Sequence, residues 1–183
     1  VRKGYFWLAP ALVMVPALMT SAVLPFGSSL FGEKMVIADL DVGPLFVFAV
    51  ASLSVYGIVL AGWASNSKYP FLGGVRSTSQ MISYEISLGL SIVPLLMIYG
   101  ELNLSNIVQY QAENGWALLP LWGEGLSVKG FLLAVPVFLS FIVFMTSMFA
   151  ETNRLPFDLP ECETELVAGY HTEYSSMKFA LFF

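Results

Sequence analysis

The chain has 183 residues, of which 57% are hydrophobic and only 11% charged, whereas about a quarter of the residues in a soluble domain are charged. Together with a mean hydropathy of +0.75, this predicts an all-α polytopic membrane protein. A net charge of −5 without Lys/Arg clusters argues against nucleic-acid binding. The one cysteine, Cys162, excludes an intrachain disulfide and a multi-cysteine iron–sulfur site, and one histidine leaves little for a zinc or haem site.

Four runs with at most one charge are long enough to cross a hydrocarbon core, which takes about 20 helical residues. They cover residues 5–26, 44–65, 77–100 and 130–150, and a fifth helix is expected to begin at 172 and to be cut off at 183. Pro10 and Pro16 lie inside the first run, where they kink a membrane helix without forbidding it. The third run contains its single charge at Glu85.

The segments between these runs are interpreted as loops. In the polar stretch 66–76, Gly73 and Gly74 are expected to reverse the chain, and 101–129 is expected to be a long loop. The chain is treated as a single membrane domain, 1–183. Because it begins abruptly and stops inside an apolar run, we expect it to be an internal piece of a longer protein.

The acidic loop, residues 151–171, and the residue pair that follows it are the most unusual part of the sequence. Six of the 13 acids lie here, with Arg154 as the only unambiguous cation: Glu151, Asp158, Glu161, Glu163, Glu165 and Glu173. Carboxylates crowded beside lipid are expected to accept and pass on protons, because crowding and desolvation favour the neutral form. The plainer alternative is that acids in the first turn of a short helix complement its dipole. That alternative does not explain Glu151 or Glu173.

Within this loop, the spacing of Asp158 and Glu161 is that of an N-cap and its capping-box acid. It predicts a short helix over 161–168, which Gly169 would end. Arg154 can bridge carboxylates bidentately. His171 could shuttle protons near neutral pH, but it is interpreted as an ordinary surface histidine.

Glu85 lies about 12 Å along the third helix, counted from Ser77 at 1.5 Å per residue. Its side chain is too short to reach water easily, so it should face protein or a water-filled cavity. An ionisable residue inside a membrane is a functional candidate; the alternative is a buried glutamate kept neutral by protonation or one hydrogen bond. Arg76, at the end of the same helix, is equally well explained as a topology anchor.

Lys and Arg counts predict the orientation of the chain. One side contains most of them: Arg2, Lys3, Lys68, Arg76 and Arg154. The other side contains Lys34 and Lys129. The acidic loop is therefore expected to face the cytoplasm.

Two stretches, covering about a third of the chain, resemble the H subunit of bacterial NADH-quinone oxidoreductase, the respiratory complex I subunit equivalent to mitochondrial NADH dehydrogenase subunit 1. They are GWASNSKYPFLGGVRSTSQMISYE (Gly62–Glu85) and AETNRLPFDLPECETELVAGYHTEYSSMKFALFF (Ala150–Phe183). The string PFDLPE followed by E-x-E-L-V-x-G-Y is long and specific. Pro70, Gly74 and Cys162 stand where alanine or leucine is more usual in that family, which puts little in doubt.

The resemblance implies a multi-pass subunit of the bacterial inner membrane, docked against quinone-reducing peripheral subunits and other membrane-arm subunits. Its acidic loop would help to build the quinone chamber and the start of the proton route. The residues expected there are Glu85, Glu151, Asp158, Glu161, Glu163, Glu165 and Glu173, supported by Arg76 and Arg154. Quinone would be the substrate, while NADH, FMN and iron–sulfur clusters would bind to other subunits. The family's first transmembrane helix and its last helices are expected to lie outside this chain and to complete the site.

Three alternatives remain open at this stage. The first is the homologous membrane subunit of a membrane-bound hydrogenase, which need not bind quinone. The second is a free-standing proton or ion transporter that uses Glu85 as its carrier acid. The third is a structural anchor for a peripheral arm, in which charge-neutral substitutions would affect assembly but not turnover.

Overall fold

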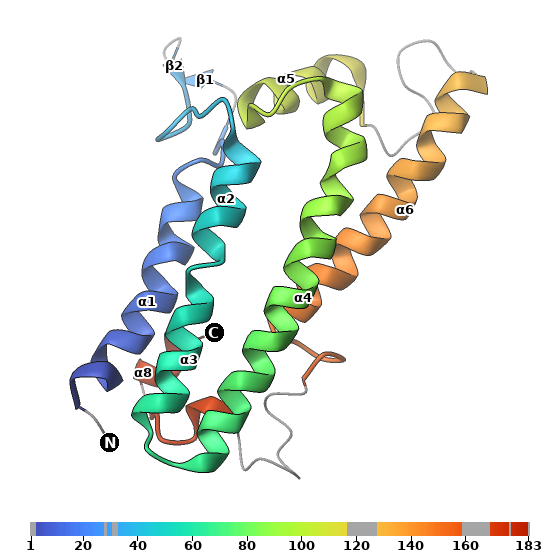
Figure 1. Ribbon diagram of the computed structural model, residues 1–183. Coiled ribbons are helices and arrows are strands. Elements are labelled where there is room, and N and C mark those ends of the chain that lie inside the picture. The colour runs from blue at the N-terminus through green and yellow to red at the C-terminus, as the bar shows by residue number, and fades with distance from the viewer. Residues whose placement is uncertain are drawn as a thin grey trace.

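The computed structural model describes residues 3–27, 29–30, 33–116, 128–158, 169–175 and 177–182. The elements in chain order are α1 (Lys3–Ser21), β1 (Ser29–Leu30), β2 (Glu33–Lys34), α2 (Gly43–Ala51), α3 (Ser54–Ala64), α4 (Lys68–Tyr99), α5 (Leu104–Asn114), α6 (Val128–Glu151), the 3-10 turn η1 (Gly169–His171) and α8 (Met177–Ala180). Figure 1 shows a bundle of long helices with short elements at both ends. The two strands pair antiparallel as a very small hairpin.

Four helical segments are long and apolar enough to cross a membrane: Lys3–Ser21, Gly43–Ala64, Lys68–Tyr99 and Leu132–Glu151. They confirm the predicted all-α polytopic membrane fold. Pro10 and Pro16 lie inside α1, as expected. The second span is interrupted at Ser52 and Leu53, where α2 ends and α3 begins. The Ser52 hydroxyl donates to the carbonyl oxygen of Ala49 at 2.9 Å, a local bond that competes with regular helix geometry.

The predicted chain reversal at Gly73 and Gly74 is wrong. Helix α4 already begins at Lys68, and its 32 residues give a length of about 48 Å, more than a hydrocarbon core of about 30 Å requires. The chain reverses earlier, near Asn66, which has a φ of 52°. Glycine at position 73 is needed for close packing, because a Cβ there would lie 2.9 Å from the Cα of Gly169.

The interpretation of 101–129 as a loop missed α5, which lies across one end of the bundle (Figure 1). Asn103 caps this helix by accepting a hydrogen bond from the backbone N–H of Asn106 at 3.1 Å. Asp39 joins α5 to the loop after β2, because it accepts bonds from Lys34 Nζ at 2.8 Å, Asn103 Nδ2 at 2.9 Å and Ser105 Oγ at 3.1 Å. The bonds from Lys34 and Asn103 lower the pKa of Asp39.

The predicted fifth helix does not begin at residue 172. Residues 172–175 are turns or irregular, and the four-residue α8 follows. This segment packs against the start of α1, where the rings of Tyr174 and Phe6 stack at 4.0 Å and Lys178 Nζ lies 3.6 Å from the ring centroid of Trp7. Position 183 lies outside the described residues.

Helix α3 packs between α1 and α4, and α4 packs against both α6 and η1. The core combines residues of several elements: Ala9, Val55, Ile58, Ala61, Met81, Tyr170 and Tyr174. Gly57 lets α3 approach α1 closely, because a Cβ there would lie 2.9 Å from the carbonyl oxygen of Ala9. The start of α1, the α3–α4 turn and η1 lie at one end of the bundle, and the hairpin and α5 lie at the other (Figure 1).

Candidate functional site: the α4–α6 junction

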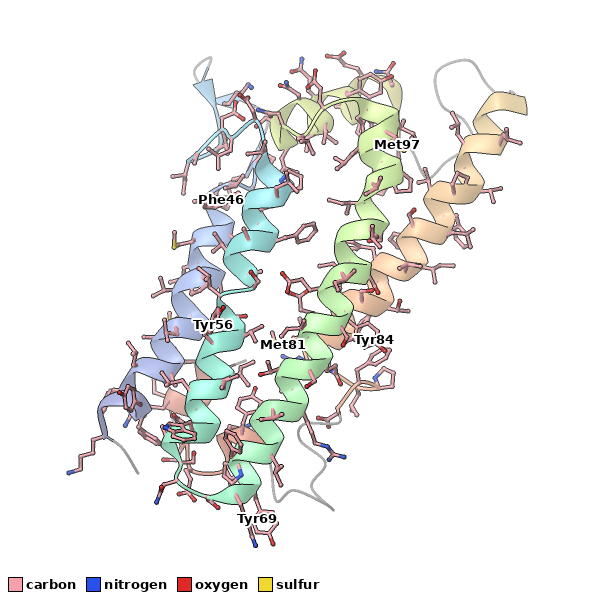
Figure 2. The ribbon with its side chains drawn as sticks, in the orientation of Figure 1. Phe46, Tyr56, Tyr69, Met81, Tyr84 and Met97 are labelled. Atoms are coloured by element: carbon pink, nitrogen blue, oxygen red, sulfur yellow. The ribbon has the colours of Figure 1, made fainter. Side chains whose placement is uncertain are left out.

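One face of α4 contacts both described ends of the acidic loop. Gly73, Ser77, Gln80 and Tyr84 follow the helical spacing i, i+4, i+7 and i+11, so they form one stripe. Gly73 lies against η1, at the end of the loop, whereas the other three contact the chain between Ala150 and Phe157. Figure 2 shows Tyr84 on α4 turned toward the chain that leaves α6, while Met81 lies on the side facing α3.

The amide group of Gln80 holds the end of α6 and the start of the loop. Its Nε2 donates toward three oxygen atoms: the Ala150 carbonyl at 2.7 Å, the Phe157 carbonyl at 2.9 Å and Asn153 Oδ1 at 3.1 Å. All three contacts are acceptors, which fixes the orientation of the amide. Gln80 is 8% exposed, and its Oε1 has no hydrogen-bond partner among the residues that the structure describes.

Asn153 determines where α6 ends. It has a left-handed φ of 49°, its N–H donates to the Ala150 carbonyl at 3.3 Å, and the N–H of Arg154 donates to the Phe149 carbonyl at 3.1 Å. This is the bonding pattern of a Schellman cap, in which Asn is the common substitute for Gly. The Asn153 Nδ2 also donates to the buried Ser77 Oγ at 2.9 Å. The cap of α6 is therefore attached directly to α4.

Phe157 and Asp158 lead into the loop. The rings of Phe157 and Tyr84 meet edge to face at 5.3 Å. Asp158 is half-buried, and its carboxylate acts electrostatically on His171, at the other end of the loop. The prediction of a surface histidine is wrong, because His171 is 6% exposed. Burial lowers the pKa of His171, and the negative charge of Asp158 opposes that shift.

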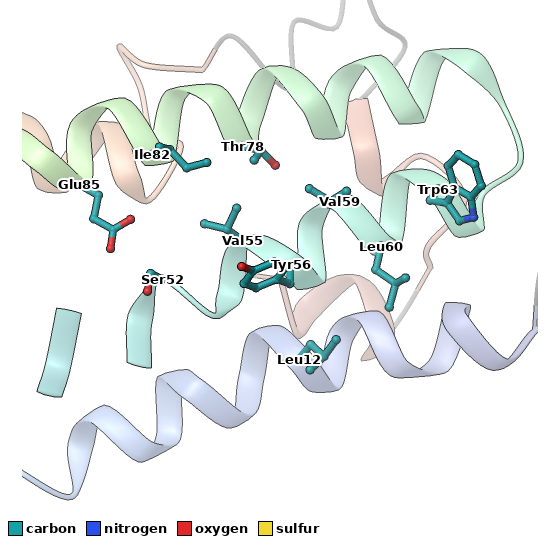
Figure 3. Close-up of a pocket in the computed structure, with 10 residues that line it drawn as sticks. All are labelled: Leu12, Ser52, Val55, Tyr56, Val59, Leu60, Trp63, Thr78, Ile82 and Glu85. Atoms are coloured by element: carbon teal, nitrogen blue, oxygen red, sulfur yellow. The ribbon is translucent and has the colours of Figure 1, made fainter. Parts of the chain in front are cut away.

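Glu85 lines a cavity of about 640 Å³ between α3 and α4, with α1 on the far side. The other lining residues are mostly apolar: Leu12, Ser52, Val55, Tyr56, Val59, Leu60, Trp63, Thr78 and Ile82. Figure 3 shows the carboxylate of Glu85 at one end of this cavity, near Ser52 at the α2–α3 break, with Trp63 at the opposite end. Glu85 thus faces a protein cavity, as an acid at this depth should.

Glu151 lines a second cavity, of about 390 Å³, together with Asn153, Arg154 and the residues Ala51 and Ser54 that flank the α2–α3 break. The two cavities therefore meet the same helix break, one at Ser52 and the other at its neighbours. The carboxylates of Glu85 and Glu151 interact electrostatically. A carboxylate in the last turn of a helix opposes the helix dipole, so Glu151 does not stabilise α6.

The remaining predicted site residues are not brought into this junction, or lie outside the described part of the chain. Arg76, Arg154 and Glu173 are exposed, and of these Arg154 lines the second cavity. Glu161, Glu163 and Glu165, with the helix predicted over 161–168, lie outside the described residues. Among the residues that are described, no group of three His, Cys, Asp or Glu side chains could hold a metal ion.

Sequence reasoning missed Ser77, Gln80 and Asn153, which are uncharged. A signal for two of them was present, because Ser77 and Gln80 are polar residues at i and i+3 at the start of an apolar span, and such residues often bond across helices. The role of Asn153 depends on its left-handed backbone, which the sequence did not reveal.

Long apolar helices that hold two interacting acids beside internal cavities define a polytopic membrane protein with an ionisable site within its helical bundle. The family is identified by the whole sequence: residues 1–183 match the family model described as NADH dehydrogenase, and the chain belongs to this family. The resemblance seen in the two sequence stretches is thus confirmed.

The similar curated proteins are all H subunits of NADH-quinone oxidoreductase. The chain is 50% identical to the first of the H subunits numbered in Geobacter metallireducens, over 99% of its length and 51% of the relative. It is 53% identical to the H subunit of Rickettsia prowazekii, over 99% of the chain and 48% of the relative. For the H subunit of Leptospira biflexa the identity is 47%, over 100% and 51%. The chain thus spans about half the length of the curated relatives it matches.

Proposed function

We propose that this chain is part of the membrane subunit of a proton-translocating NADH:quinone oxidoreductase, where it helps to form the quinone chamber and the first part of the proton route. The names of its relatives support this proposal, as does the site between α4 and α6. The chain itself would hold no redox group. NADH, FMN and iron–sulfur clusters would belong to partner subunits, and quinone would be the substrate.

The observation that carries the proposal is the electrostatic interaction between Glu85 and Glu151 on two packed helices. Two like charges close together cannot both ionise freely, so the pair takes up and releases protons as a coupled unit. Each acid lines one of the two cavities that meet at the α2–α3 break. A proton could therefore pass from one acid to the other across this junction.

Reduction of a quinone to a quinol consumes two protons and transiently places negative charge in the chamber. Negative charge near carboxylates favours their protonated forms. The acids of the loop, including Glu161, Glu163 and Glu165, would respond first, and Glu151 would pass the change to Glu85. The chain thus relays a redox event in the chamber to the interior of the membrane arm.

In this arrangement the acidic loop faces the cytoplasm and the quinone-reducing peripheral subunits. The excess of Lys and Arg on that side supports the orientation. Arg76 and Arg154 are exposed near the loop, where they could bind carboxylates of the loop or of a partner subunit.

The proposal is tested in the full-length protein within the assembled complex, reconstituted in membrane vesicles. Glu85→Gln and Glu151→Gln keep the size of each side chain but prevent ionisation. We expect each to lower the rate of NADH-dependent quinone reduction and the accompanying proton translocation by at least about tenfold, since a relay acid cannot be replaced by an amide. Glu113→Gln is the matched control, because Glu113 is exposed on α5 at the opposite end of the bundle.

Normal rates and normal proton translocation in both variants would remove the two acids from the mechanism. Reduced assembly with a normal rate per assembled complex would instead favour the structural anchor. Proton transport by the purified subunit without its partners would favour a free-standing transporter.

A further inference from the structure

Gln80 is the strongest further candidate for a role in this site, because it touches the backbone immediately before Glu151. Its Nε2 donates to the Ala150 carbonyl at 2.7 Å, the shortest of its three contacts. Gln80 also lies on the same helix as Glu85, five residues earlier. One side chain therefore links the helix that carries Glu85 to the last turn of the helix that carries Glu151.

The hydrogen bonding of Gln80 is more than packing requires. Two N–H groups face three acceptors, so one acceptor must share a donor, and the buried Oε1 has no partner among the described residues. An unpaired buried amide oxygen costs stability, and an apolar residue of similar size would avoid that cost. A glutamine that persists here despite its cost suggests a requirement for its donors.

We propose that Gln80 is a positioning residue that fixes Glu151 relative to Glu85 by holding the Ala150 and Phe157 carbonyls against α4. The inference rests on the proposed function, since it assigns Gln80 a role through Glu151. Without the two N–H donors, the cap of α6 would remain, because Asn153 and Arg154 form it with backbone bonds. The capped end would lose its attachment through Gln80, and the separation of the two carboxylates would no longer be set by that contact.

The test uses the full-length protein in the assembled complex and begins with Gln80→Met. Methionine has the same length and an unbranched shape, so it fills the site without donating hydrogen bonds. We expect the rate of coupled quinone reduction per assembled complex to fall by about tenfold, because loss of an orienting contact misplaces the reacting groups. Gln111→Met is the matched control: Gln111 is a half-buried glutamine on α5, and its Nε2 donates to Tyr99 Oη at 2.9 Å.

A double-mutant cycle separates positioning from general stabilisation. If Gln80 acts through Glu151, Gln80→Met should slow the wild-type complex but cause no further loss in a Glu151→Gln background. A normal rate in Gln80→Met, an equal loss in Gln111→Met, or a full multiplication of losses in the double variant would each overturn the proposal. Gln80→Leu repeats the cycle if the methionine variant does not assemble, and failure of both to assemble would assign Gln80 to folding instead.

This outcome is distinguishable from failure of the proposed function. Wild-type rates in Glu85→Gln and Glu151→Gln would remove the acids themselves, whatever Gln80 does. Slow acid variants combined with an additive or silent Gln80→Met would remove only the positioning role.

Discussion

Gly73 of α4 and Gly169 of η1 are in backbone contact, so close that a Cβ on Gly73 would lie 2.9 Å from the Cα of Gly169. Seven residues along the same helix, Gln80 binds the chain that enters the acidic loop. A single face of α4 thus fixes both described ends of the loop. The loop that dominates the sequence depends for its position on a helix face that the sequence presents as unremarkable.

The first prediction concerns this contact. Gly73→Ala should displace η1, because a Cβ less than 3.0 Å from backbone atoms forces a shift that overpacking makes costly, by about 1–3 kcal/mol. Amide hydrogen exchange at Tyr170 and His171 should accelerate. Gly89→Ala is the control on the same helix, since a Cβ there would meet no heavy atom of the described residues within 4 Å. Equal exchange in the two variants would show that the close approach does not hold η1.

The second prediction concerns His171, whose pKa burial lowers and whose neighbour Asp158 opposes that shift. Because the folded state favours the neutral imidazole, this contribution to stability is present above the ordinary pKa of 6.5 and is lost as pH falls below it toward the lowered value. Asp158→Asn removes the opposing charge, so the pKa of His171 should fall further.

His171 is the single histidine of the sequence, so protein labelled on histidine gives one ring signal in an NMR titration. The signal should titrate below 6.5 in the wild type and lower still in Asp158→Asn. A rise of the pKa in the variant would show that Asp158 does not face the ring.

The third prediction concerns Asp39, which binds Lys34, Asn103 and Ser105. Its pKa lies below 3.8, so the stabilisation is present above pH 3.8 and is lost as pH falls through the folded-state value. Asp39→Asn should loosen the start of α5 at neutral pH, which hydrogen exchange at Asn106 would detect. Asp41→Asn, an exposed acid in the same loop, is the control. The effect should be modest, because the group is solvent-exposed and salt screens its ion pair.

The membrane spans were predictable because an uncharged run of about 20 residues has few alternatives to a transmembrane helix. The details failed where one residue type serves two purposes. Gly73 and Gly74 predicted a turn, yet in the structure glycine permits close helix packing. Helix α5 was missed because its length and polarity resemble those of a loop, and its stability comes from its Asn103 cap and contacts with the bundle.

The candidate site was predictable in part. Glu85 and Glu151 were found because charge is rare in this chain, and the structure places both beside cavities. Their interaction depends on the register between α4 and α6, which residues far apart in sequence set through Gln80 and Asn153. Burial of His171 likewise depends on tertiary packing. No local pattern carries such information.

The coupling between Glu85 and Glu151 is measured most directly by combining Glu85→Gln and Glu151→Gln in the full-length complex and following coupled quinone reduction. If the two acids act as one unit, the double variant should be no slower than the slower of the two single variants. Losses that multiply, as for independent sites, would contradict a shared proton relay between α4 and α6.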